Sequence, residues 1–173
     1  MHKIDKRLTR NKSLVDSFVL HAENQKVSVA YLELCAHMAA HNNTGDLANP
    51  ALEKLCCEKA LPVPEEVPRI PKGVLFVVTA LAEVGGHSRV VADLIRSLEV
   101  PCSLFIIEPK SVVPDWMEHE VELSRGQIYK GEANHLETAK ILQEKSFSFE
   151  QILLVTNPED ITPILSYGRT FPR

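Results

Sequence analysis

The sequence lacks the features that mark membrane-spanning and nucleic-acid-binding proteins. No apolar run approaches the roughly 20 residues that a membrane helix needs, so we expect no membrane span. The chain has 19 Lys and Arg against 23 Asp and Glu, a formal net charge of −4. It therefore offers no basic field to nucleic acid or to an anionic membrane. The first 12 residues are basic, but no apolar signal core follows them, which favours a cytoplasmic location.

Cysteine is scarce, and its arrangement excludes the common motifs. The chain has four cysteines, no C-x-x-C, and one adjacent pair, Cys56 and Cys57. On a helix two adjacent side chains point about 100° apart, which does not suit one shared metal. We therefore expect reduced, buried thiols in a reducing compartment rather than a zinc or redox site.

The clearest boundary in the chain is rich in proline. Residues 61–72, L-P-V-P-E-E-V-P-R-I-P-K, contain four prolines and predict a semi-rigid, extended linker. This linker divides 173 residues into a helical N-terminal appendage, residues 1–60, and an α/β domain, residues 73–173. Limited proteolysis is expected to separate the two parts.

The appendage shows three helical patterns. Polar residues 1–12 are expected to be frayed, and Ser13 is the candidate N-cap of a short first helix. A second helix is predicted from about residue 26 to His41. Asn49 and Pro50 have the residue types of a helix start, an N-cap followed by proline at the first helical position, and predict the third helix.

Glu33, His37 and His41 are spaced four apart in the second predicted helix. This spacing puts the three side chains on one helical face and suits a metal. The sequence shows neither a further strong ligand nor supporting residues around them. A solvated helix face is therefore favoured, and no metal is predicted.

The α/β domain is organised around residues 73–98. An unbroken apolar run over residues 74–78 predicts a strand buried on both faces, and apolar residues from Val90 to Leu98 recur at helical spacing. Gly85 and Gly86 open that helix. Glycines there allow close approach of the backbone to a ligand, and a helix N-terminus offers N–H groups to an anion. The spacing is not G-x-G-x-x-G, so the nicotinamide and flavin fingerprint is missing.

Further strands and helices alternate after this unit. Strands are predicted over residues 102–107, 127–130 and 151–156, with helical segments over 116–120, 134–142 and 161–167. The alternation predicts a Rossmann-like parallel sheet of order 3-2-1-4, about half of a doubly wound fold. Because the chain stops where further strands would be expected, we expect the domain to be incomplete. The last strand would then self-associate through its edge, or be shielded by residues 161–167.

The strand V-L-F-V-V-T, the loop after it and the helix start G-G-H-S-R-V-V resemble the first βα unit of bacterial GT-B-fold glycosyltransferases that use nucleotide sugars. The order A-A-H-N-N-T-G, then N-P-A-L-E-K-L, resembles an N-terminal helical extension of some of them. The resemblance implies an N-terminal, acceptor-side domain. A nucleotide sugar would be the co-substrate, the acceptor is not specified, and no other cofactor is implied. Nothing matches the second domain, which holds the donor, so independent activity is not expected.

The candidate site lies where strands one and four of the predicted sheet end, at the switch point of the strand order. Gly85, Gly86, Ser88 and Arg89 are the candidates for binding the phosphates, through backbone N–H groups, a hydroxyl and a charge. His87 is the candidate catalytic residue and would hydrogen-bond a sugar hydroxyl or a phosphate. The alternatives are a tight turn, a histidine that only occupies the first helical turn, and a solvated arginine.

Other polar groups in the domain have simpler interpretations. Trp116, His119 and Glu120 form a local cluster, for which a tryptophan packed at the rim is favoured. The acidic residues of the region are predicted to be solvated, because no two have a spacing that assigns an acid and a base: Glu83, Asp93 and Glu108. Two other classes of function remain open, a small Rossmann-like nucleotide-binding module and a non-catalytic interaction protein.

Overall fold

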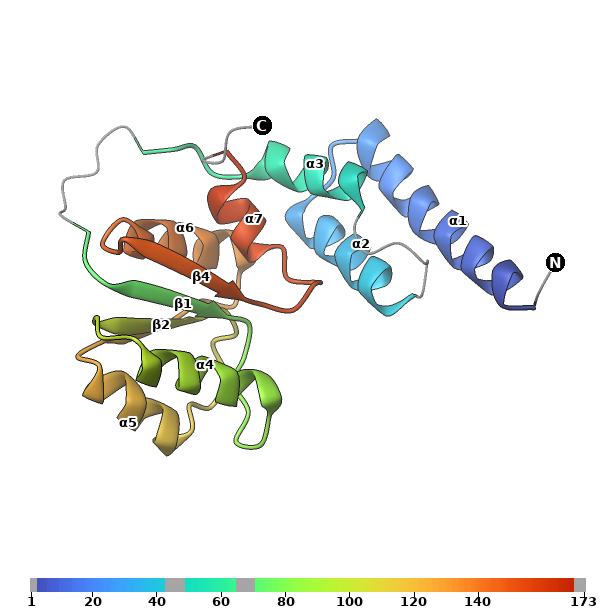
Figure 1. Cartoon of the computed structure of the whole chain (residues 1–173). Helices are drawn as coiled ribbons and strands as arrows, with labels where there is room; N and C mark the ends of the chain where they lie inside the picture. The colour runs from blue at the N-terminus through green and yellow to red at the C-terminus, as the bar shows by residue number, and fades with distance from the viewer. Residues whose placement is uncertain (1–2, 43–48, 65–70, 170–173) are drawn as a thin grey trace. The chain divides into compact units, whose positions relative to one another are not determined.

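The computed structural model of the chain describes residues 3–42, 49–64 and 71–169, which group into two compact units (Figure 1). The helical unit comprises residues 1–62 and 158–173, and the α/β unit comprises residues 63–157. Residues 158–173 thus group with the helices, whereas the sequence division placed them in the α/β domain. Independent folding of 1–60 and 73–173 stays a prediction.

The helical unit contains α1 (Lys3–Asn24), α2 (Val29–His41), α3 (Pro50–Lys59) and α7 (Thr162–Tyr167). The prediction of a frayed start with a cap at Ser13 is wrong, because α1 already begins at Lys3. No Gly or Pro interrupts residues 3–24, and Lys, Arg and Leu are good helix formers. The predicted cap of α3 is confirmed, since the Asn49 side chain accepts a hydrogen bond from the Leu52 N–H at 3.1 Å.

The helices of this unit pack through small and branched apolar side chains. The buried side chains follow helical spacing on α1 and α2 and continue on α3, on the residue before α7 and on α7 itself: Val15, Val19, Ala22, Leu32, Cys35, Ala36, Leu52, Cys56, Ile161 and Leu165. Burial raises the pKa of Cys56 to about 12, so this thiol is protonated and inert at neutral pH. Cys35, Cys56 and Cys102 are buried free thiols, as predicted, whereas the fourth thiol, Cys57, is only partly buried.

The short helix α7 explains why the C-terminal segment belongs to the helical unit. It packs against α3, and the Leu61 N–H donates to the Leu165 carbonyl at 2.8 Å. Just beyond the helix, the Arg169 guanidinium donates to the Glu58 carbonyl at 2.9 Å. A backbone and a side-chain hydrogen bond therefore fasten the C-terminal half of α7 and the residues just after it to the end of α3.

The α/β unit is built on the predicted parallel sheet. Its strands are β1 (Val74–Val78), β2 (Cys102–Ile106), β3 (Ile128–Lys130) and β4 (Gln151–Val155). They are hydrogen-bonded in the order β3-β2-β1-β4, every pair parallel, which confirms the 3-2-1-4 prediction. All residues of β1 and β2 are buried, as expected for central strands covered on both faces.

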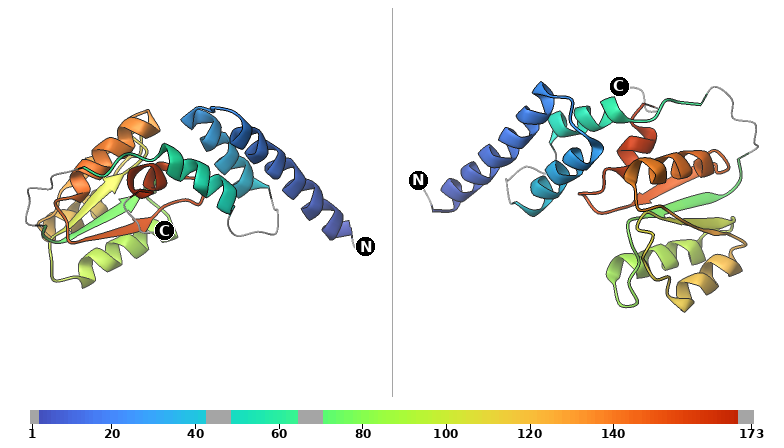
Figure 2. Two further views of the ribbon diagram at one scale, coloured as in Figure 1. Left: turned by 90° about the horizontal axis from the view of Figure 1, so that it is seen from above. Right: turned by 180° about the vertical axis from the view of Figure 1, so that it is seen from behind.

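Helices cover both faces of this sheet. In Figure 1, α4 (Gly86–Ser97) and α5 (Asp115–Leu123) lie on one face, and α6 (His135–Ser146) lies on the other. Figure 2 shows the same arrangement from above, with α4 in green and α6 in orange on opposite sides of the strands. Phe76, Leu104 and Met117 are fully buried in the core beneath α4 and α5. Asn134 is the N-cap of α6, and its side chain accepts hydrogen bonds from the N–H groups of Leu136 and Glu137.

The apolar run of the last strand predicts a buried strand, but β4 is only partly buried. Leu153 is 37% exposed and Leu154 is 46% exposed, although both belong to β4. Their register partners on β1, Phe76 and Val77, are fully buried. Within the described residues β4 pairs only with β1, so its outer edge has no strand beside it. An edge strand has a neighbouring strand on one side only, so its side chains are less covered than those of a central strand.

We expect this edge to drive self-association, because two exposed leucines flank an edge that no described strand pairs. Leu154→Lys places a charge on the edge and is expected to weaken association by about tenfold or more. Leu123→Lys is the matched control, since Leu123 is 66% exposed at the end of α5. Sedimentation velocity over a concentration series measures the effect. A wild-type chain that stays monomeric throughout, or equal association of both variants, contradicts the prediction.

Candidate functional site

The loop from β1 to α4, residues 79–85, is held at the carboxyl edge of the sheet by two buried serines. The Leu81 N–H donates to Ser111 Oγ at 2.9 Å, and the Ala82 N–H donates to Ser88 Oγ at 3.0 Å. Ser111 belongs to the loop after β2, whereas Ser88 is in the first turn of α4. The loop is thus held both by the loop after β2 and by the first turn of α4. The hydrogen bond to Ser88 also fixes where α4 starts relative to the loop.

The ends of β1 and β4 meet beside this loop, as the strand order requires. The Asn157 N–H donates to Thr79 Oγ1 at 2.8 Å across 78 residues of sequence. A hollow of about 40 Å³ opens between these ends and the first turn of α4. It is lined by Val78, Thr79, Ala80, Leu81, His87, Ser88, Val91, Val155 and Asn157. A volume this small holds about one water molecule, whereas drug-sized ligand pockets measure about 300–1,000 Å³.

The predicted site residues divide into two groups around this hollow. His87 lines it with an exposed side chain, and Ser88 lines it while being only 3% exposed. The Arg89 guanidinium lies elsewhere, 5.8 Å from the centre of the Trp116 ring, in cation–π geometry. Gly85 and Gly86 form the N-cap and first residue of α4 without lining the hollow.

The two glycines differ in the space around them. A Cβ on Gly85 would lie 3.3 Å from the Ala82 methyl group, which is a tight contact inside the loop. A Cβ on Gly86 would meet nothing within 4 Å. Neither glycine has a positive φ, so backbone conformation does not require glycine at either position. The packing of this chain therefore accounts for Gly85 but gives no reason for Gly86.

Four of the other residues singled out from the sequence have structural partners: Glu83, Asp93, Trp116 and Glu120. Trp116 packs at the rim of the core and donates from Nε1 to Glu83 at 3.2 Å. Arg96 donates to Glu120 at 2.6 Å and to Asp93 at 2.8 Å. The hydrogen bond that Arg96 donates to Glu120 raises the pKa of the guanidinium, which therefore stays charged. These contacts favour a structural role for the group.

Two exposed valines stand at the same edge of the sheet. Val84, in the β1–α4 loop, is 87% exposed, and Val112, in the loop after β2, is 78% exposed. They are the most exposed large apolar residues among those that the structure describes. Neighbouring apolar side chains that are presented to solvent can mark a surface that something else covers.

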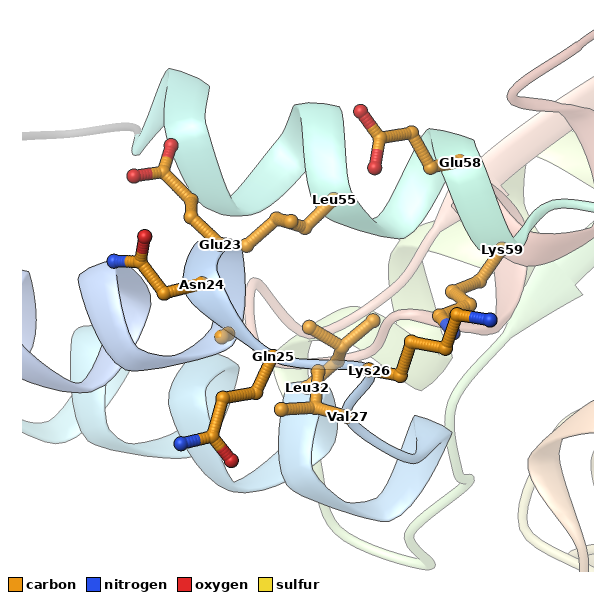
Figure 3. A pocket seen from close by; sticks show the side chains of 10 residues that line it. Glu23, Asn24, Gln25, Lys26, Val27, Leu32, Leu55, Glu58 and Lys59 are labelled. Carbon is orange, nitrogen blue, oxygen red and sulfur yellow. The ribbon is translucent and has the colours of Figure 1, made fainter.

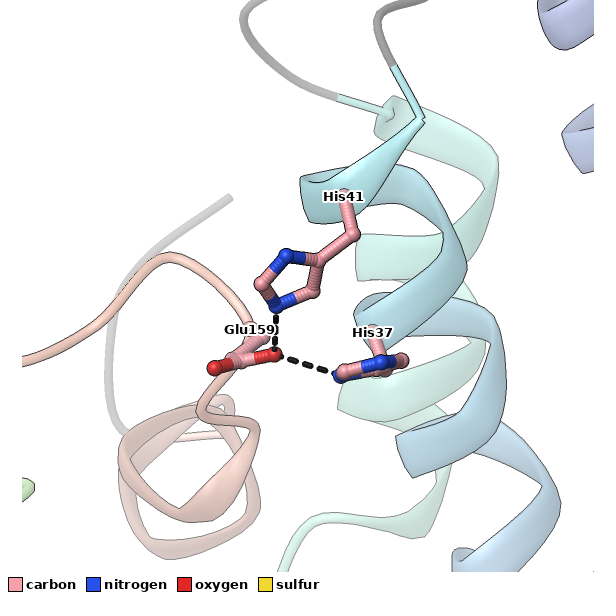
Figure 4. A group of neighbouring side chains, drawn as sticks. All are labelled: His37, His41 and Glu159. Atoms are coloured by element: carbon pink, nitrogen blue, oxygen red, sulfur yellow. Dashed lines mark hydrogen bonds and ion pairs between the residues drawn. The ribbon is translucent and has the colours of Figure 1, made fainter.

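A second group of functional side chains gathers in the helical unit. His37 and His41 of α2 both reach one oxygen of Glu159, which lies just before α7 (Figure 4). The sequence pointed to the histidine pair but grouped it with Glu33, which is not part of this cluster. Glu159 was missed because it is 118 residues from His41, and no local pattern marks such a partner.

The hydrogen bond from His37 is the main reason that the pKa of Glu159 lies below its ordinary value. The carboxylate is therefore ionised at neutral pH. In this form it accepts hydrogen bonds from both imidazole rings.

Two larger hollows also lie in the helical unit. One, of about 320 Å³, opens where the turn between α1 and α2 approaches α3 (Figure 3). Its rim carries exposed side chains of both charges, including Glu23, Lys26, Glu58 and Lys59. The other, of about 330 Å³, lies between α1, α2, α3 and the segment before α7. Neither brings together a set of groups that defines a reaction.

Comparisons with known proteins supply no relative: no family model, no curated protein and no solved structure matches the chain. Among the described helices, none combines the length and the apolar character needed to cross a membrane.

Proposed function

We propose that this chain forms the N-terminal, acceptor-side part of a glycosyltransferase that uses a nucleotide-sugar donor. The observation that carries the proposal is the placement of Gly86 and His87. Both stand at the start of α4, beside the switch point of a β3-β2-β1-β4 parallel sheet. Ligands of open parallel sheets bind at this position.

The proposal assigns a role to each part of the edge. In glycosyl transfer the acceptor oxygen bonds to the anomeric carbon, and the bond from that carbon to the diphosphate breaks. The leaving diphosphate gains negative charge, which the N–H groups and dipole of α4 would stabilise. Gly86 leaves open space through which phosphate oxygens could approach those N–H groups. His87, at the hollow, would hydrogen-bond a reacting hydroxyl or a phosphate.

The size of the hollow also argues against a self-sufficient nucleotide-binding module. About 40 Å³ cannot enclose a nucleotide, so most contacts to a donor would come from another surface. The exposed side chains of Val84 and Val112 favour a second domain or partner chain at this edge. We therefore expect no turnover by these 173 residues alone and a donor Kd weaker than about 1 mM.

Titration of ¹⁵N-labelled chain with uridine, guanosine and adenosine diphosphate sugars tests the assignment. The expected result is weak, saturable shifts confined to amides of residues 80–89 and 156–157. Gly86→Ala is expected to reduce these shifts, because its methyl group occupies the approach to the N–H groups. Glu99→Ala, at an exposed position before β2, is the control and should leave them unchanged.

Three outcomes would overturn the proposal. Shifts centred on other residues would mean that the donor binds away from the switch point. Absence of shifts at about 10 mM donor would mean that the chain does not bind the donor. Micromolar affinity, or sugar transfer by this chain alone, would favour the self-sufficient module instead. In an active enzyme that contains this chain, His87→Ala is expected to lower turnover more than donor affinity. An unchanged rate would mean that His87 only occupies the first turn of the helix and takes no part in the reaction.

A further inference from the structure

Three side chains with metal-binding atoms converge within the helical unit, near the end of α2. His37 Nδ1 lies 2.7 Å and His41 Nε2 lies 2.8 Å from the same oxygen of Glu159. All three atoms lie within 4.8 Å of one another. Figure 4 shows the two rings on one side of the helix, with the carboxylate reaching between them.

The distances between these three atoms are close to the distances between the ligand atoms of a coordinated metal ion. Zinc binds histidine nitrogen at about 2.0–2.1 Å and carboxylate oxygen at about 2.0–2.2 Å, so tetrahedral ligand atoms stand roughly 3.3–3.5 Å apart. The two hydrogen bonds must therefore lengthen by about half an ångström. The side chains are free to make this change, since His37 is 61% exposed, His41 58% and Glu159 31%.

We propose that His37, His41 and Glu159 bind one divalent first-row transition-metal ion, with Zn²⁺ as the probe. Two imidazoles and one carboxylate suit such ions, whereas Mg²⁺ and Ca²⁺ prefer oxygen ligands throughout. On binding, each ring nitrogen that faces Glu159 gives up its hydrogen bond and coordinates the ion. A neutral ring must then change tautomer: the facing nitrogen loses its proton to solvent and the other nitrogen takes one up. An imidazolium keeps the proton on its other nitrogen and releases one proton to solvent.

The backbone around the ligands is already fixed. Just before His37, the buried residues Cys35 and Ala36 hold the orientation of α2. Beyond Glu159, Ile161 is only 3% exposed, and Asp160 accepts a hydrogen bond from the Thr162 N–H at 3.0 Å. The backbone that carries Glu159 is therefore anchored on its C-terminal side, which lowers the entropy lost when the ion binds. The last turn of a helix also favours a cation through its dipole.

The arrangement indicates a fastening role rather than hydrolysis. His37 and His41 have the i, i+4 spacing by which helical histidines share zinc, but Met38 stands where the metalloprotease helix has its glutamate base. The ion would tie α2 to a residue 118 positions away from His41. It would thereby hold the segment that leads into α7 within the helical unit.

Titration calorimetry of the full chain with Zn²⁺ tests this site. We expect one ion per chain with a Kd below about 10 μM. We expect binding to weaken by about 100-fold or more in each of the variants His37→Ala, His41→Ala and Glu159→Gln. Loss of a residue that only hydrogen-bonds to a metal ligand weakens binding by about 10–100-fold. His119→Ala removes an exposed helical histidine of α5 and should leave the Kd unchanged. Far-UV circular dichroism confirms that each variant is folded.

Absorption of the Co²⁺ form gives a second readout. Nitrogen and oxygen ligands give weak visible bands, whereas thiolate ligation adds intense near-ultraviolet absorption. Thiolate bands would place the ion at a cysteine such as Cys57, which is partly exposed. That result would overturn the proposal, as would equal binding by all variants or no saturation at about 100 μM Zn²⁺.

Discussion

Gly126→Ala should destabilise the α/β unit by at least about 3 kcal/mol, a large share of the roughly 5–15 kcal/mol of a typical domain. A Cβ on Gly126 would overlap the carbonyl oxygen of Cys102 and lie 2.5 Å from its carbon. Both atoms belong to the backbone of β2, so no rotamer change relieves the clash. The turn cannot withdraw cheaply, because the Gly126 N–H donates to the Val121 carbonyl at 3.0 Å.

Gly86→Ala is the matched control, and we expect its stability to be unchanged or raised by up to about 1 kcal/mol. Its added methyl group meets open space at the first residue of α4. Urea unfolding followed by fluorescence compares the variants, since Trp116 is the single tryptophan and belongs to the α/β unit. A loss below about 1 kcal/mol for Gly126→Ala would show that the β2 backbone yields to the methyl group.

The contrast between these glycines also bears on function. If Gly86→Ala folds normally but reduces donor-induced shifts, glycine at this position serves a ligand rather than the fold. If both folding and binding are unaffected, the double glycine is only a helix start. Gly85 cannot decide the question, because its substitution also crowds Ala82.

The sheet was predictable because local patterns and general topology rules agree. An unbroken apolar run defined β1, and the alternation of strands with helices fixed parallel pairing and the strand order. That order in turn placed the loop after β1 beside the end of β4, where Thr79 and Asn157 are hydrogen-bonded. The geometry of the candidate site thus followed from the fold, whereas its ligand did not.

Features that depend on distant neighbours were not predictable. The residues of β4, Q-I-L-L-V, are as apolar as those of a central strand, and only the lack of a strand on its far side leaves its leucines exposed. Glu159 likewise has no local signal, because its contact with His37 spans 122 residues. In each case a tertiary contact, or its absence, decides the environment of a residue whose local sequence is ordinary.

Phe76→Ala should cost about 3–5 kcal/mol of unfolding free energy in the α/β unit. Phe76 is fully buried at the middle of β1, between Leu104 of β2 and Leu153 of β4 in the strand register. Truncation removes the ring from the core beneath α4 and leaves a cavity that two paired strands cannot close. The expected loss is the sum of the transfer free energy of the removed ring and the free-energy cost of the cavity that it leaves.

Leu94→Ala provides the control for the same core, because Leu94 is on α4 but 41% exposed. We expect it to cost less than about 1 kcal/mol, and Phe76→Leu to cost an intermediate amount. Trp116 fluorescence in urea again measures all three, with m-values compared to confirm that the same surface unfolds. Equal losses for Phe76→Ala and Leu94→Ala would mean that β1 is not the centre of this core. The loop and helix start that carry His87 would then lack the rigid base on which the proposed site depends.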